Sequence, residues 1–83
     1  MLETRVREVV ASVFGVAPGE LPERLDPDTV PGWTSLRQIQ LMMALEKAFG
    51  IEIDPNLLPA LASGSAIVRY LEETLAVPEG TSR

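Results

Sequence analysis

The segment from Leu36 to Phe49 constrains the fold most, because its apolar residues recur at helical spacing on two sides of one helix. At about 100° per residue, one stripe falls in a single sector and predicts a buried face. It consists of Leu41, Met42, Leu45 and Phe49. A second stripe lies on the other side and consists of Leu36, Ile39 and Met43. Since one buried stripe is enough to fold a helix, we expect the second to cover a neighbouring loop or to meet a partner.

Two further segments predict amphipathic helices of the same bundle. Apolar residues recur at helical spacing over residues 2–14, and Gly15 follows as a C-cap. Ser63 is an N-cap for a last helix that ends near Ala76, and a short helix is expected at about residues 56–62, with its proline in the first turn. We therefore expect an all-α fold: a small bundle of three main helices plus one short helix, with a long packed loop between the first two. Its predicted core adds Val6, Val10, Val13, Ile67 and Leu71 to the first stripe.

The proline-rich loop, residues 16–34, cannot hold a long regular helix. Scattered apolar residues can pin it against the helices; these are Leu21, Leu25, Val30 and Trp33. We expect Trp33 to close the loop on the core with its indole N–H at the surface, and the alternative is that it flanks Ser35. The run at residues 26–29 is typical of a turn. It lacks the glycine and terminal glutamate of a calcium loop, so we expect no metal site.

Composition sets the scale of the fold and excludes most enzyme chemistries. Eighty-three residues with 46% hydrophobic content can form one modest core, so we expect a single domain over residues 1–77 and a disordered tail at 78–83. The chain has no Cys and no His, which removes thiol nucleophiles, His-based triads and the usual zinc ligands. A net charge of −5 argues against binding to nucleic acid or anionic membranes. No apolar run approaches the ~20 residues of a membrane span, so we expect a cytoplasmic, non-catalytic protein.

Ser35 stands at the start of the central helix, and its role has two interpretations. With Gln38 it matches the capping box S-x-x-Q, in which the two side chains satisfy each other's backbone N–H groups. Alternatively, the free N–H groups and the positive end of the helix dipole favour a phosphate-like anion there. The motif alone favours the capping role, whereas the second apolar stripe beside Ser35 favours a functional one.

The turn Gly-Trp-Thr-Ser-Leu at residues 32–36, followed by the run Ile-Gln-Leu-Met-Met-Ala-Leu-Glu-Lys-Ala-Phe-Gly-Ile-Glu-Ile at 39–53, resembles the acyl carrier protein family. The resemblance covers nearly the whole chain. In that family a Gly-x-Asp-Ser-Leu turn opens the second helix, and its serine bears a phosphopantetheine arm. The resemblance implies that a phosphopantetheinyl transferase moves 4'-phosphopantetheine from coenzyme A to the hydroxyl of Ser35. The thiol of the arm would then hold acyl or aminoacyl cargo as a thioester, which fits a chain without cysteine.

The resemblance also implies that loading and transferring enzymes dock around Ser35 in transient complexes with a monomer. Two departures from the family bear on those partners. Thr34 replaces the usual Asp, which removes a charge associated with engaging the transferase and its metal, and the central helix is poor in acidic residues. The scarcity of acidic residues favours a dedicated partner set, as for a stand-alone carrier of polyketide, antibiotic or other secondary-metabolite biosynthesis, and the alternative is neutral change on a solvated face. The predicted docking residues are Thr34, Leu36, Arg37, Ile39, Gln40, Met43, Glu46 and Lys47.

A different class of function uses the same surface without modification. In that alternative the chain is a helical interaction domain, and Leu36, Ile39 and Met43 form a static docking face. A helix-turn-helix regulator is disfavoured, because the chain is acidic and has a proline-rich loop where a tight turn belongs. Modification of Ser35 separates the first two functions.

Overall fold

The computed structural model of the chain describes residues 2–75. Its elements in chain order are α1 (Leu2–Phe14), the 3-10 turn η1 (Pro18–Glu20), α2 (Ser35–Phe49), the 3-10 helix η2 (Pro55–Leu61) and α3 (Gly64–Leu75). The predicted all-α fold of three main helices plus a short one is confirmed. The predicted helix end near Ala76 and the predicted tail at 78–83 lie outside the described residues. No helix within residues 2–75 has the length and apolar character needed to cross a membrane.

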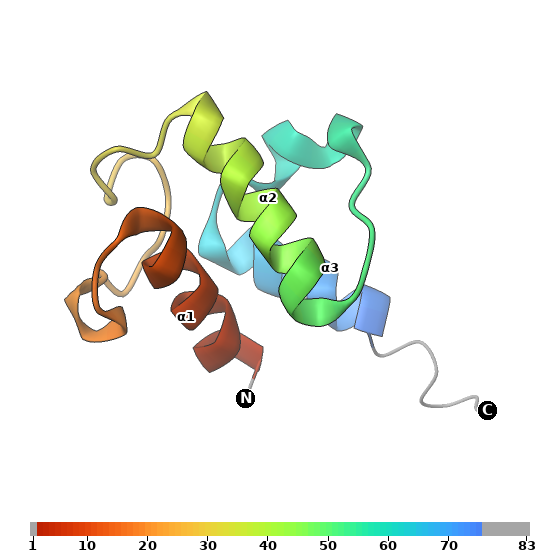
Figure 1. The fold of residues 1–83 in the computed structure, drawn as a ribbon, viewed down its shortest axis with the longest axis horizontal. Coiled ribbons are helices and arrows are strands. Elements are labelled where there is room, and N and C mark those ends of the chain that lie inside the picture. Colours follow the sequence, from red (N-terminus) through yellow and green to blue (C-terminus); the bar gives the residue numbers. More distant parts are fainter. Residues whose placement is uncertain (1, 76–83) are drawn as a thin grey trace.

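The three main helices enclose one core. α1 packs against both α2 and α3, and η2 also packs against α2 and α3 (Figure 1). Most of the predicted core residues are buried: Val6, Val10, Leu41, Met42, Leu45, Ile67 and Leu71. Val13 and Phe49 are only half-buried at the edge of this core. The guanidinium of Arg5 lies 4.6 Å from the centre of the Phe49 ring, so a cation contacts the face of this ring at the edge of the core.

The end of α1 confirms the predicted C-cap. Gly15 has a φ of 71°, a left-handed conformation that glycine adopts without steric cost. The N–H of Val16 donates to the carbonyl of Ala11 at 3.0 Å, and the N–H of Gly15 donates to that of Ser12 at 3.4 Å. This pair of hydrogen bonds satisfies the last carbonyls of α1 and turns the chain into the loop.

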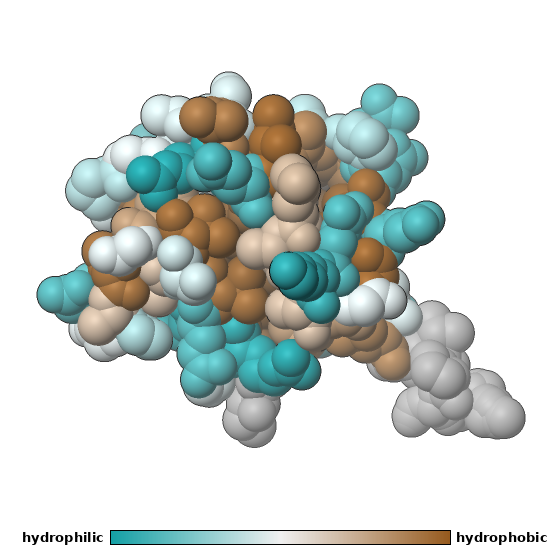
Figure 2. Space-filling model, in the orientation of Figure 1, coloured by the Kyte–Doolittle hydropathy of each residue, from teal (hydrophilic) through white to brown (hydrophobic). Residues whose placement is uncertain are grey.

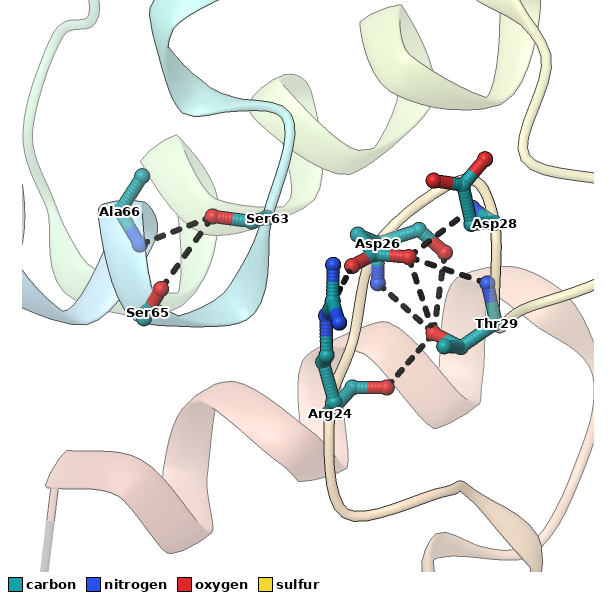
Figure 3. Close-up of polar contacts among 7 residues, drawn as sticks. All are labelled: Arg24, Asp26, Asp28, Thr29, Ser63, Ser65 and Ala66. Carbon is teal, nitrogen blue, oxygen red and sulfur yellow. Dashed lines mark hydrogen bonds and ion pairs between the residues drawn. The ribbon is translucent and has the colours of Figure 1, made fainter.

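The loop at residues 16–34 is packed, as predicted, through its buried apolar residues: Leu21, Leu25, Val30 and Trp33. The predicted turn is also present, since Oδ1 of Asp26 accepts the N–H groups of Asp28 and Thr29 at 2.9 and 3.0 Å (Figure 3). Burial acts to raise the pKa of the Asp26 carboxyl, but hydrogen bonds from Arg24, Thr29 and Asp28 outweigh it and hold the pKa below its usual value. Within the described residues, no cluster of three or more His, Cys, Asp or Glu could hold a metal ion.

The start of α3 confirms the predicted N-cap. Oγ of Ser63 accepts the N–H of Ala66 at 3.1 Å (Figure 3). The next residue ties the helix to the loop, because the N–H of Gly64 donates to the carbonyl of Leu25 at 2.7 Å. The loop and α3 therefore hold each other in place behind the central helix.

The expected place of Pro59 in the first turn of the short helix is wrong. Pro59 lies inside η2, where it would break an α-helix because it lacks an N–H group. The segment is instead wound as a 3-10 helix, a form used in short pieces. The carbonyls of Leu58 and Leu61 accept hydrogen bonds from the side chain of Gln38 on α2. A tertiary contact from α2 therefore ties η2 in place.

Candidate functional site

A tight turn delivers Ser35 to the first position of α2. Gly32 has a φ of 84°, and the N–H of Thr34 donates to its carbonyl at 2.9 Å. Thr34 is then extended, and its Oγ1 accepts the N–H of Arg37 at 3.3 Å, which makes Thr34 the N-cap. The turn thus places Ser35 at the mouth of the helix while leaving its side chain out of the capping.

The capping box, which was one of the two interpretations of Ser35 and Gln38, is therefore not formed. The helix begins one residue earlier than expected, at Ser35 itself, and threonine serves as an N-cap as serine would. Gln38 does not reach back to the helix start, because its side chain is buried and bonds to η2. Within residues 2–75, the Ser35 hydroxyl makes no hydrogen bond.

The surroundings of Ser35 fit an anion bonded to its hydroxyl. The residue is exposed. Among the described residues, the backbone N–H groups of Ser35 and Leu36 have no hydrogen-bond partner, whereas those of Arg37 and Gln38 are used by the cap. Two free donors and the positive end of a 15-residue helix favour a negatively charged group there. A phosphate ester on Oγ would meet both donors without displacing any protein contact.

Behind Ser35, Trp33 and Gln38 form a buried polar contact. Nε1 of Trp33 donates to Oε1 of Gln38 at 2.6 Å. Nε2 of Gln38 donates to the carbonyls of Leu58 at 3.1 Å and Leu61 at 2.9 Å. The expectation that the indole N–H lies at the surface is therefore wrong, because α2 supplies its acceptor inside the protein.

Sequence reasoning missed the role of Gln38. It was considered as the partner of Ser35 in a capping box. The available signal was its spacing, because positions 38, 41, 42 and 45 share one helical face. Among the buried residues of α2, Gln38 is the only polar one.

A pocket of about 380 Å³ opens beside Ser35, between α2 and η2. Its walls are mainly apolar and include Trp33, Ile39, Leu58 and Pro59, with Gln38 among them. Trp33 thus closes the loop on the core and also flanks the site, so its two expected roles coexist. A larger hollow of about 750 Å³ lies between α1, the loop and the start of α3, away from Ser35.

The second apolar stripe is exposed, as expected. The exposed fractions are 63% for Leu36, 46% for Ile39 and 62% for Met43. Figure 2 shows hydrophobic surface over α2, interrupted by hydrophilic side chains. The predicted docking residues Thr34, Gln40 and Lys47 are exposed as well. These six residues and Ser35 share one side of the molecule, along α2.

The other two predicted docking residues, Arg37 and Glu46, make contacts within the chain. Nη1 of Arg37 donates to the carbonyl of Val13 at 2.7 Å, and its guanidinium lies 5.5 Å from the centre of the Phe14 ring. Oε2 of Glu46 accepts the N–H of Ile53 at 2.7 Å. Both side chains are half-buried, so they help to hold α2 to α1 and to the segment that follows α2.

Comparisons with known proteins point to one family. A family model described as "Phosphopantetheine attachment site" matches residues 4–71. The chain is 43% identical to "Acyl carrier protein 2" of Pseudomonas aeruginosa over 79 residues, which covers 93% of this chain and 95% of that protein. It is 36% identical to "Acyl carrier protein" of Wolinella succinogenes over 67 residues, which covers 81% of this chain and 88% of that protein.

Proposed function

Because the chain belongs to the acyl carrier protein family, we propose that Ser35 is the residue that bears its 4'-phosphopantetheine. The carrier role and the covalent cofactor follow from membership of the family. The observation that carries the assignment to Ser35 is its exposed hydroxyl beside the backbone N–H groups of Ser35 and Leu36 at the start of α2, none of which has a hydrogen-bond partner in the part of the chain that the structure describes. When attached, phosphopantetheine supplies the thiol that this cysteine-free chain lacks.

The residues of the chain serve this role by attachment and presentation. Thr34 caps α2, so Ser35 Oγ is free to be esterified. The N–H groups of Ser35 and Leu36 would hold the phosphate against the helix. The exposed stripe of Leu36, Ile39 and Met43 then offers partner enzymes an apolar surface next to the attachment point. Tethering at one point raises the local concentration of cargo at a docked active site.

The surface of α2 bears on which enzymes bind this carrier. α2 carries no acidic residue in its first turn and has Lys47 in its last, and its Glu46 is bonded to Ile53. This surface is therefore less acidic than the partner-facing helix typical of the family, which supports a dedicated set of enzymes. We assign the chain to a secondary-metabolite pathway such as polyketide biosynthesis, as a cytoplasmic monomer with acyl cargo.

The test of the attachment site is intact mass and peptide mapping. The full chain is incubated with coenzyme A, Mg²⁺ and a panel of phosphopantetheinyl transferases, including the one native to its source. We expect the mass of one phosphopantetheine, mapped to the peptide that contains Ser35. A panel that leaves the folded chain unmodified, or a label on Ser63 or Ser65, refutes the assignment.

Exchange of Met43 for Glu should impair docking more than folding. The side chain is 62% exposed, so a charge there costs little in stability, typically within about 0.5 kcal/mol for a surface site. It would, however, place a charge in the apolar face that partners must cover. Transfer of cargo to a partner enzyme and the melting temperature are measured together. Met43→Leu, which keeps the face apolar, is the matched control.

The outcome that contradicts the docking role is an unstable Met43→Glu variant that transfers cargo normally while folded. An interaction domain without modification would use the same exposed stripe, but membership of the acyl carrier protein family implies a covalent arm and disfavours that alternative. Such a domain would bind its partners whether or not Ser35 is modified.

A further inference from the structure

A buried polar side chain, Gln38, is one of the residues that line the pocket beside Ser35, and this feature bears on the size of the cargo. The pocket of about 380 Å³ has mainly apolar walls and lies in the size range of small-molecule sites. Further along the same face of α2 lie Leu41 and Leu45, which are 0% and 1% exposed. In the helix, Gln38 lies about one turn after Ser35, about one turn before Leu41 and about two turns before Leu45.

The amide of Gln38 is fixed from three sides. Its Oε1 accepts from the indole of Trp33, and both hydrogens of Nε2 are used by the carbonyls of Leu58 and Leu61. These bonds join the loop, α2 and η2 at the inner side of the pocket. An alkyl chain that passed Gln38 into the core would leave these polar groups unpaired in a buried setting, which is costly.

We propose that Gln38 is a specificity-determining residue that keeps long alkyl groups out of the core. The cargo of this carrier is then a short acyl group held in the pocket beside Ser35. The proposal rests on attachment at Ser35. It names a cargo class that the family assignment leaves open. Without this amide, the buried face of α2 would be apolar from the pocket inward, and each added methylene would favour entry.

The experiment compares a short and a long cargo on the same protein. A transferase is supplied with butanoyl- or dodecanoyl-coenzyme A, and peptide mapping first establishes loading on Ser35. NMR then follows the indole N–H of Trp33, the only tryptophan, and the methyl groups of Leu41 and Leu45. In the wild type we expect the core methyl signals to be the same with both cargoes.

Gln38→Met keeps an unbranched side chain of similar size and removes the amide. In this variant we expect dodecanoyl, but not butanoyl, to shift the core methyl signals. We also expect slower hydrolysis of the long thioester, since burial of two further methylene groups corresponds to about a tenfold change in an equilibrium constant. Gln40→Met, the same change at an exposed position of α2, is the matched control and should retain wild-type core signals.

The outcomes separate the two proposals. If dodecanoyl on wild-type Ser35 shifts the signals of Leu41 and Leu45, Gln38 is no barrier, while the attachment site stands. This wild-type comparison holds even if Gln38→Met does not fold. A folded Gln38→Met variant that matches wild type with both cargoes also overturns the role of Gln38. If no label reaches Ser35, the attachment site fails and the inference fails with it.

Discussion

Ser35→Ala should accept no phosphopantetheine and should remain as stable as the wild type. The hydroxyl is the group to be esterified, so its removal leaves no point of attachment. The sequence pattern alone made a capping loss of about 0.5–2 kcal/mol a reasonable expectation. The structure removes that cost, because Thr34 is the N-cap and the Ser35 side chain makes no hydrogen bond within the described residues. We therefore expect complete loss of modification with a change in unfolding free energy within about 0.5 kcal/mol.

Thr34→Ala is the matched control and should show the opposite pattern. It removes the hydroxyl that accepts the N–H of Arg37, which should cost about 0.5–2 kcal/mol of stability. It keeps the hydroxyl of Ser35, so the end-point mass should still include the arm. Intact mass and urea unfolding of both variants are the measurements. A modified Ser35→Ala chain would refute the site, and a destabilised Ser35→Ala with an unaffected Thr34→Ala would return the cap to Ser35.

Helical periodicity was sufficient for the elements and for most of the core. Leu41 and Leu45 lie on one face of α2 because the helical repeat is 3.6 residues, and both are buried. Their burial could be predicted without knowing which segments pack against them. Gly15 and Ser63 cap their helices through local hydrogen bonds, so short motifs predicted them. The exposed side of α2 followed from the same periodicity, since Leu36 falls outside the buried stripe.

The features that sequence reasoning missed depend on contacts between distant segments. Gln38 bonds to Leu58 and Leu61, which lie 20 and 23 residues away, and no local pattern reports such a contact. The indole N–H of Trp33 donates to Gln38, only five residues away, but the ring also packs against Phe14, which lies 19 residues earlier in the chain. The N-cap is Thr34 and not Ser35 because the helix begins one residue earlier than the sequence pattern indicated. Helix boundaries differ by one or two residues between methods of assignment.

Leu45→Ala should be among the most destabilising single changes in this chain. Leu45 is 1% exposed and lies in the core between α2 and α1, so truncation removes buried methyl groups and leaves a cavity. Such changes cost about 2–5 kcal/mol, against a total of about 5–15 kcal/mol for a typical domain. For Phe49→Ala we expect a smaller loss of stability than for Leu45→Ala, because Phe49 is half-buried and faces the Arg5 guanidinium.

Leu36→Ala is the matched control for this prediction. It makes the same chemical change in the same helix, but Leu36 is 63% exposed and should lose about 0.5 kcal/mol or less. Urea unfolding followed by circular dichroism gives the free energy of each variant, and the fluorescence of Trp33 reports the loop independently. Because both changes replace Leu with Ala in the same helix, the difference between them reports mainly the burial of Leu45 and the cavity that its truncation leaves. Equal losses for Leu45→Ala and Leu36→Ala would mean that the two stripes of α2 are not divided between core and surface, and the exposed face proposed for docking would lose its basis.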